Sequence, residues 1–169
     1  RSFDIYPQQC SAHAYARIDF AMCRKERYAS SGAYPQVSPG MLEDDLIRRD
    51  FTINAMALPL RSDGPGALID RYHGVEDVRA RRLRVLHAHS FLDDPSRILR
   101  GIRFAQRFGC TFEPSTKRRL VAALRAGALE RLNRGRWRKE LWLMLEEPDP
   151  LACFRQLGRL LTQAGCTSV

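Results

Sequence analysis

The sequence has no long apolar run, since none of its apolar stretches approaches the roughly 18 residues that a membrane span needs. It also has no charged segment followed by an apolar one, which is the pattern of a secretory leader. Its five cysteines show no CxxC spacing and do not cluster with any of the four histidines. These features argue against a membrane protein, a disulfide-stapled domain and a structural zinc site. We therefore expect a cytoplasmic protein with reduced thiols.

The sequence also lacks internal repeats and an initiating methionine. Its first residue is Arg1, from which we expect a processed chain or a piece of a longer one. With 169 residues, 44% of them hydrophobic, the chain is long enough for one medium domain or two small ones with a packed core.

Negative charge is scarce in the second half of the chain. Between Arg79 and Lys139 seventeen basic residues face only four acidic ones, whereas elsewhere eleven basic residues face fifteen acidic ones. A basic surface concentrated in one region is typical of proteins that bind a polyanion, most often nucleic acid. The alternative is a set of arginine-rich helices whose charges are simply solvated.

Short strands and turns dominate the pattern of the first half. Residues 14–22 alternate between polar and apolar, which predicts a half-buried strand with Asp19 on its polar face. The next stretch is rich in Ser, Gly and Pro and predicts a long loop over 24–40. The remaining predictions are a short helix at 41–49, a strand at 51–60, a turn at 61–66 and a short strand at 67–70 that completes a hairpin.

The second half has the pattern of helices. In FLDDPSRILRGIRFAQRFG, Asp94 fits a helix N-cap, Pro95 the first helical position and Gly109 the residue that ends the helix. Two faces recur at helical spacing, an apolar one with Ile98, Ile102 and Ala105 and a basic one with Arg100, Arg103 and Arg107.

Three more helices are predicted near 115–126, 135–146 and 150–162. The whole pattern predicts an α+β fold. A mixed or antiparallel sheet with helices occupies residues 1–83, and an all-α part occupies residues 84–169.

Asp94 and Arg97 stand three residues apart and therefore share one face of the predicted helix. A carboxylate accepts hydrogen bonds, and a guanidinium only donates them. Adenine and cytosine present an amino donor beside a ring-nitrogen acceptor, whereas guanine and uracil present the reverse pattern. An Asp–Arg pair facing such an edge would accept A and C and reject G and U, because the wrong base leaves buried polar groups unpaired. The alternative is that Asp94 only caps the helix and Arg97 is an ordinary surface residue.

The stretch LIRRDFTINAMAL (46–58) places charged and polar residues in an otherwise apolar segment, where burial without partners is costly. Arg49 could bind a phosphate through two nitrogens, and Asp50 and Asn54 could hydrogen-bond a ribose or a phosphate. The alternative is an internal salt bridge from Arg48 or Arg49 to one of the three acids about one turn earlier. Residue types alone do not separate the two.

Three segments resemble the tRNA nucleotidyltransferase (CCA-adding) and bacterial poly(A) polymerase family. In order along the chain, they are EDDLIRRDFTINAMA, ALIDRYHG and HSFLDDPSRILRGIRFAQRFG. This family is part of the polymerase-β-like nucleotidyltransferase superfamily, and the resemblance covers residues 15–145. It implies that 1–83 form the C-terminal part of a nucleotidyltransferase head and 84–169 a helical neck with the start of an RNA-binding body. The implied partners are the tRNA 3′ end, ATP and CTP, and the implied cofactor is Mg²⁺.

The resemblance also implies roles for matching residues. The implied nucleotide-binding residues are Arg49, Asp50, Asn54, Asp94, Arg97, Arg100 and Arg103. Among them, Arg49 would contact the triphosphate, and Asp94 and Arg97 would form the template that reads the incoming base. Asp19 aligns with the third carboxylate of the metal site and is the implied catalytic and metal-binding residue.

The sequence departs from the family pattern in several places. The family's N-terminal GGxxRD-type stretch and its Asp-x-Asp metal pair are absent and the C-terminal domains stop short at Val169, so we expect a chain truncated at both ends. Asp93 stands where Glu is usual, and Arg71 and His73 replace the Pro and Gly common in that turn. Because Asp19 alone cannot hold a metal pair, we expect weak or no catalysis by this chain alone.

Two functions remain open. The first is a template-independent nucleotidyltransferase that adds C, A or both to tRNA, by attack of the RNA 3′-hydroxyl on the α-phosphate of CTP or ATP. Poly(A) synthesis belongs with this interpretation, because the motifs are shared. The second is a non-catalytic nucleotide- or RNA-binding fragment of a truncated or split enzyme that needs a missing N-terminal half.

Overall fold

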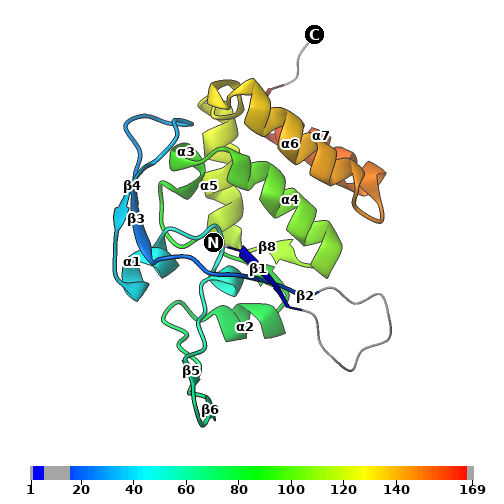
Figure 1. Cartoon of the computed structure of the whole chain (residues 1–169). Helices are drawn as coiled ribbons and strands as arrows, with labels where there is room; N and C mark the ends of the chain where they lie inside the picture. Colours follow the sequence, from blue (N-terminus) through cyan, green and yellow to red (C-terminus); the bar gives the residue numbers. More distant parts are fainter. Residues whose placement is uncertain (1, 6–15, 167–169) are drawn as a thin grey trace.

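The computed structural model describes residues 2–5 and 16–166 and has mixed α and β structure, which confirms the predicted fold class (Figure 1). The strands are β1 Ser2–Ile5, β2 Ala16–Asp19, β3 Arg24–Arg27, β4 Gln36–Pro39, β5 Leu60–Arg61, β6 Gly64–Pro65, β7 Arg82–Leu83 and β8 Thr111–Phe112. The helices are α1 Leu42–Ile47, α2 Gly74–Arg79, α3 Ser90–Asp93, α4 Ser96–Phe108, α5 Pro114–Arg125, α6 Arg134–Leu145 and α7 Pro150–Ala164. Single 3₁₀ turns occupy Thr52–Asn54 and Leu129–Arg131.

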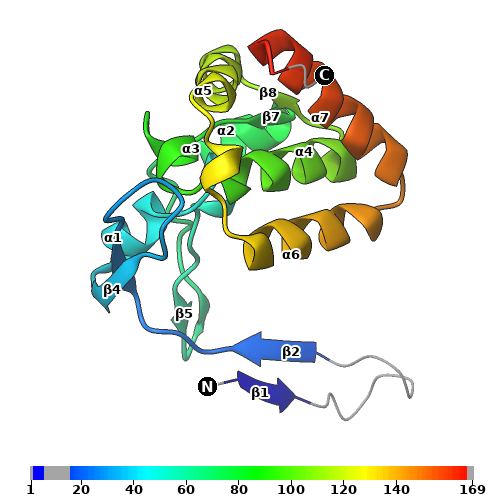
Figure 2. The same cartoon turned by 90° about the horizontal axis from the view of Figure 1, so that it is seen from above.

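The strands of the described residues pair two by two. β1–β2, β3–β4 and β5–β6 are antiparallel, and β7–β8 is parallel. In Figure 2, β1 and β2 lie apart from the helices, at the lower edge of the view. No helix among the described residues is both long and apolar enough to cross a membrane.

Two predictions for the N-terminal region need correction. The segment 24–40 is not one long loop, because β3 and β4 form a hairpin in it, with Glu26 paired to Val37. The strand predicted at 14–22 is present at 16–19, residues 14 and 15 lie outside the described part, and Phe20 and Met22 are 61% and 77% exposed. The alternating pattern therefore does not produce a buried apolar face at these last two positions.

The strand predicted at 51–60 is wrong over most of its length. Phe51 makes a single bridge to Val85 and is followed by the 3₁₀ turn, and regular pairing begins only at Leu60. Phe51 and Ala55 are both fully buried, so the apolar spacing that matters here is four residues, as in a helical turn. A hairpin is present as predicted, but its strands pair inside the predicted turn, Leu60 with Pro65 and Arg61 with Gly64, and the strand predicted at 67–70 is reduced to a single bridge between Ile69 and Ala57.

Helix α4 lies at the centre of the core. Its apolar stripe is confirmed, since Ile98, Leu99 and Ile102 are fully buried. Its predicted end is also confirmed, because Gly109 has a φ of 59° and caps the helix. Figure 2 shows α6 on one side of α4 and α5 with β8 on the other.

The other predicted helices are present as α5, α6 and α7. One hydrophobic cluster joins Phe51 and Leu83 to Ile98, Leu120 and Leu157. β8 also returns to pair with β7, so the helical half contributes a strand. The core is therefore continuous across residue 83.

Gly101 lets two aromatic rings pack against the backbone of α4. A Cβ at this position would lie 2.8 Å from ring atoms of both Phe51 and Phe112. We expect Gly101→Ala to lower the free energy of unfolding by about 1–3 kcal/mol through overpacking. Urea denaturation measures the change. Gly158→Ala in α7 is the matched control: nothing lies near its added Cβ, so helix propensity should raise the stability by up to about 1 kcal/mol. Equal effects of the two variants would contradict this packing account.

His73 precedes α2 in a left-handed conformation, with a φ of 60°. This conformation is strained for a residue with a Cβ and unstrained for glycine. We expect His73→Gly to raise the free energy of unfolding by about 0.5–1 kcal/mol in urea denaturation. His73→Ala removes the same imidazole but keeps the Cβ, and it should give no such gain. If both variants stabilise the protein alike, the imidazole and not the backbone is the source of the strain.

Candidate functional site

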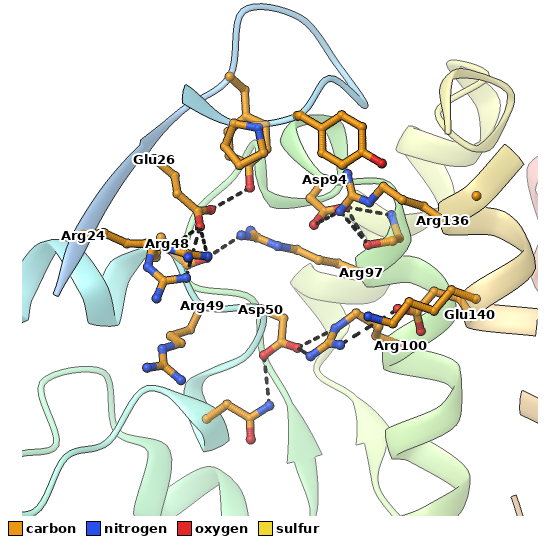
Figure 3. Close-up of a pocket in the computed structure, with 17 residues that line it drawn as sticks. Arg24, Glu26, Arg48, Arg49, Asp50, Asp94, Arg97, Arg100, Arg136 and Glu140 are labelled. Carbon is orange, nitrogen blue, oxygen red and sulfur yellow. Dashed lines mark hydrogen bonds and ion pairs between the residues drawn. The ribbon is translucent and has the colours of Figure 1, made fainter. Parts of the chain in front are cut away.

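A cavity of about 780 Å³ opens between the β3–β4 hairpin, the end of α1, the start of α4 and α6 (Figure 3). Seven of its lining side chains are basic and four are acidic. The basic ones are Arg24, Arg48, Arg49, Arg97, Arg100, Arg136 and Lys139, and the acidic ones are Glu26, Asp50, Asp94 and Glu140. Its volume lies in the range of small-molecule sites, and the basic excess favours an anion.

The two arginines at the end of α1 share one buried carboxylate. Arg48 and Arg49 bind opposite oxygens of Asp45, with nitrogen–oxygen distances of 2.5 and 2.7 Å. Burial raises the pKa of Asp45, but the hydrogen bonds and charges of Arg49 and Arg48 outweigh it, so the pKa is lowered. The internal salt bridge considered from the sequence is thus present. The Arg49 side chain nevertheless remains 44% exposed, against 19% for Arg48, so Arg49 is accessible to a second anion.

Asp50 is buried and fully engaged by the protein. It accepts hydrogen bonds from the Phe51 N–H, the Asn54 amide and the Arg100 guanidinium, the first two at 2.9 Å. Burial raises its pKa, yet the charge of Arg100 and these hydrogen bonds together lower the pKa below its ordinary value. Asp50 therefore orients Asn54 and Arg100, both of which line the cavity.

Asp94 lies in the wall of the same cavity and caps α4. Its Oδ1 accepts from the Ser96 N–H at 3.0 Å and from the Ser96 hydroxyl at 2.6 Å, so the carboxylate binds the first turn as predicted, although Pro95 and not Asp94 stands at the N-cap position. The helix begins at Ser96, with Pro95 already in helical geometry. The other oxygen, Oδ2, pairs with Arg136 of α6 at 2.5 Å, so Asp94 also joins two helices across the cavity.

Arg97 is not an ordinary surface residue, since only 4% of it is exposed. Its Nη1 donates to the Ser90 hydroxyl at 2.6 Å and its Nη2 to the Arg48 carbonyl oxygen at 2.5 Å. These bonds fix the guanidinium in the cavity wall beside Asp94 (Figure 3).

A series of alternating charges runs from the cavity into the helical half. In order, it consists of Asp50, Arg100, Glu140, Arg103, Glu147 and Arg107. Burial raises the pKa of Glu140, and Arg100 and Arg103 offset this only in part. Arg100 and Glu140 line the cavity, whereas Arg103 is buried behind them and does not.

Asp19 lies outside the cavity lining, exposed on β2. Within the described residues there is no group of three or more His, Cys, Asp or Glu side chains placed to hold a metal ion. Each cavity acid is also within 4.0 Å of an arginine, namely Glu26 with Arg24 and Arg48, Asp50 with Arg100, Asp94 with Arg136 and Glu140 with Arg100. The four cavity acids therefore do not fit a magnesium site, because their carboxylates already neutralise guanidinium groups.

The cavity includes residues that sequence reasoning did not identify. Glu26 and Tyr28 come from the segment taken as a loop, and their hydrogen bond, 2.9 Å long, lies in the wall. Arg136, Lys139 and Glu140 come from α6, more than thirty residues after Asp94. Nothing near these residues in the sequence indicated that α6 would face the motif at residues 46–58. Their helical spacing alone indicated only a common face.

Comparison with known proteins gives the family. Residues 6–84 match the Poly A polymerase head domain. An A-adding tRNA nucleotidyltransferase of Aquifex aeolicus is 43% identical over 145 residues, covering 84% of this chain. The structure of a CCA-adding enzyme in apo form II superposes with a TM-score of 0.81, at 46% identity over 85% of this chain. A tRNA nucleotidyltransferase solved with a primer tRNA and an incoming ATP analog gives a TM-score of 0.70, at 41% identity over 75% of this chain.

The chain belongs to the tRNA nucleotidyltransferase and poly(A) polymerase family, and its fold is that of the CCA-adding enzymes over the matched region. The chain spans 18% of the Aquifex relative and 34% and 37% of the two solved chains. These relatives are therefore much longer than the part of them that it matches.

The network around Asp50 gives a prediction for stability. Because its pKa is lowered in the folded state, the charged carboxylate stabilises the protein above pH 4, and this contribution is lost as the pH falls below that. We expect Asp50→Asn to lower the free energy of unfolding by about 3 kcal/mol at pH 7, since Arg100 loses its buried partner. The loss should shrink as the pH falls below about 4, because the carboxyl protonates in the unfolded chain while the folded carboxylate, with its lowered pKa, still stays charged.

Urea denaturation at several pH values measures both effects. Asp63→Asn, in the exposed turn between β5 and β6, is the matched control and should change the stability by less than about 0.5 kcal/mol. A pH-independent loss in Asp50→Asn would show that the carboxylate charge is not the stabilising element.

Proposed function

We propose that this cavity binds ATP and CTP and that the protein adds C, A or both to the 3′ end of tRNA without a nucleic-acid template. One observation carries the proposal: an acid–guanidinium pair suited to a base edge and several arginines suited to phosphates line the same cavity. The proposed nucleotide-binding residues are Arg49, Asp50, Asn54, Asp94, Arg97, Arg100 and Arg103. Arg103 acts from behind the wall, through Glu140.

The phosphate end lies at Arg49 and Arg100. The half-exposed Arg49 can add a phosphate oxygen to its contacts with Asp45, and Asp50 holds Arg100 in place. Guanidinium groups suit this task because they donate two parallel hydrogen bonds to a phosphate. Asp50 supports the phosphate end by positioning these donors.

The base end lies at Asp94 and Arg97. Both side chains already bind protein groups, but a carboxylate has about four acceptor positions and a guanidinium five N–H donors, so each has capacity for a base. The amino group of adenine or cytosine donates to Asp94, and the ring nitrogen beside that amino group accepts from Arg97. Guanine and uracil would bring an acceptor to Asp94 and a donor to Arg97, which leaves both pairs unmatched.

The wider assignment rests on the family. We propose that residues 1–83 belong to the nucleotidyltransferase head and 84–169 to the neck and the RNA-binding body, and the head-domain match to 6–84 supports this boundary. The reaction is attack of the tRNA 3′-hydroxyl on the α-phosphate with release of pyrophosphate, in the cytoplasm. Mg²⁺ is the proposed cofactor, with Asp19 as one ligand.

Poly(A) synthesis and a non-catalytic nucleotide- or RNA-binding role are the other candidates, because the cavity groups bind a nucleotide equally well in each. Incubating the protein with tRNA transcripts that end before, within and after the CCA sequence, and with each labelled nucleotide, separates them. Addition that stops at CCA, or within it, supports the proposal. A long run of A indicates a poly(A) polymerase, and nucleotide binding without incorporation indicates a binding role.

The base-reading pair gives a sharper prediction. The wild-type protein should bind ATP and CTP at least about tenfold more tightly than GTP and UTP, because a mismatched edge leaves buried groups unpaired. In Asp94→Asn the amide offers both a donor and an acceptor, so this preference should fall to less than about threefold. Equilibrium dialysis with the four nucleotides measures the ratios.

Asp93→Asn is the matched control, since Asp93 is the neighbouring carboxylate and does not line this cavity. It should keep the wild-type ratios. Equal binding of all four nucleotides to the wild-type protein would overturn the assignment of Asp94 and Arg97.

A further inference from the structure

A second cavity, of about 470 Å³, lies where the C-terminal end of α4 meets β8, α5 and α7. It is separate from the first cavity, which lies at the other end of α4 and along α6. Figure 2 shows α5, β8 and α7 gathered on the side of α4 away from α6. No residue lines both cavities.

The lining of this second cavity contains three cations and no acid. Lys117 comes from α5, and Arg155 and Arg159 come from α7. Within the described part of the chain, the Lys117 and Arg159 side chains make no ion pair, and Arg155 has only an exposed contact of 3.8 Å with Asp149. Like charges at i and i+4 destabilise a helix slightly, so Arg155 and Arg159 together cost some folding free energy, which only the exposed contact of Arg155 with Asp149 offsets among the ion pairs of the described residues.

The neutral lining also suits a phosphate. Gln106 of α4 donates to the Gln156 side-chain oxygen of α7 at 2.7 Å, which fixes both amides at the cavity and leaves the Gln156 NH₂ group to donate. The exposed Thr111 hydroxyl lies in the same lining. The cavity thus surrounds its cations with hydrogen-bond donors.

The basic row continues beyond the cavity. Arg125, two turns after Lys117 on α5, donates to the carbonyl oxygen of Gln163, another lining residue. Eight residues of α-helix rise about 12 Å, so the row is longer than a single phosphate group. Its length favours successive phosphates of a nucleic-acid strand over one small anion.

We propose that the second cavity is a binding site for the RNA phosphate backbone, formed by Lys117, Arg155 and Arg159 and distinct from the nucleotide cavity. The proposal rests on the proposed function, since the strand that it holds is the tRNA. The site reads charge and not sequence, because its three cations contact phosphates, which carry no sequence information.

The test uses the full chain and a tRNA transcript that lacks its last A. Binding is measured by fluorescence anisotropy at several KCl concentrations, for the wild type and for the triple variant Lys117→Gln, Arg155→Gln, Arg159→Gln. Each lost phosphate contact reduces the slope of log Kd against log salt by about 0.7–0.9. For the triple variant we therefore expect a slope that is smaller than the wild-type slope by about two. We also expect its Kd at low salt to be raised at least about tenfold. ATP should raise the Tm of both proteins equally, which shows that the variant is folded and its nucleotide cavity intact.

The control triple variant Arg61→Gln, Arg79→Gln, Arg138→Gln removes the same charge from exposed residues that line neither cavity. It should reduce the slope by less than one. If the cavity variant still binds ATP and binds tRNA with the wild-type Kd and slope, this inference alone is wrong. A rise of the wild-type Tm with inorganic phosphate would not rescue it, because that result shows only that a small anion binds. If the wild type binds neither ATP nor tRNA, the proposed function is wrong and the inference with it.

Discussion

The ion pair between Asp50 and Arg100 connects the two halves of the molecule. Asp50 follows α1, and Arg100 lies one turn into α4, so their contact holds one wall of the first cavity against the core helix. Removing a carboxylate from water is costly, and here two further donors, the Phe51 N–H and the Asn54 amide, add to the ion pair in repaying that cost. The result is a carboxylate whose purpose is to hold a guanidinium and an amide at fixed positions.

The rest of the cavity follows the same principle. Asp45 holds Arg48 and Arg49, Asp94 holds Arg136, and Glu140 lies between Arg100 and Arg103. Arginine remains charged under all ordinary conditions, so a cavity that concentrates it needs carboxylates behind it to stay folded when empty. The acids at this site are therefore placed as supports, and the excess of cations remains for a ligand.

The sequence was most informative where local signals agree. Pro95, Gly109 and the Ile98–Ile102 stripe all indicate α4, and its predicted course is confirmed. The β3–β4 hairpin was missed because Ser, Gly and Pro around its turn outweighed the short strands beside them. The turn after Phe51 was missed because Phe51 and Ala55, both buried, are four residues apart. A spacing of four residues fits one turn of a helix and also fits the alternation of a strand, so a short segment does not separate the two.

The candidate site was predictable only in part, for a similar reason. Residues of the two motifs could be proposed from their order and spacing, and five of them lie in one cavity wall with Arg100. The contribution of α6 could not, because Arg136 meets Asp94 only after the chain turns back on itself between α5 and α6. Ion pairs between distant segments leave no periodic signal in a sequence, so the partner of each charge had to come from the fold.

Helix α4 has one further consequence. Its N-terminal end carries Arg97 and Arg100 at one cavity, and its C-terminal end carries Gln106 at the other. An α-helix advances about 1.5 Å per residue and is stiff over this length, so α4 acts as a molecular ruler between the two. An RNA strand held at the proposed site at the C-terminal end of α4 would therefore reach the first cavity over a fixed distance, set by the length of one rigid helix.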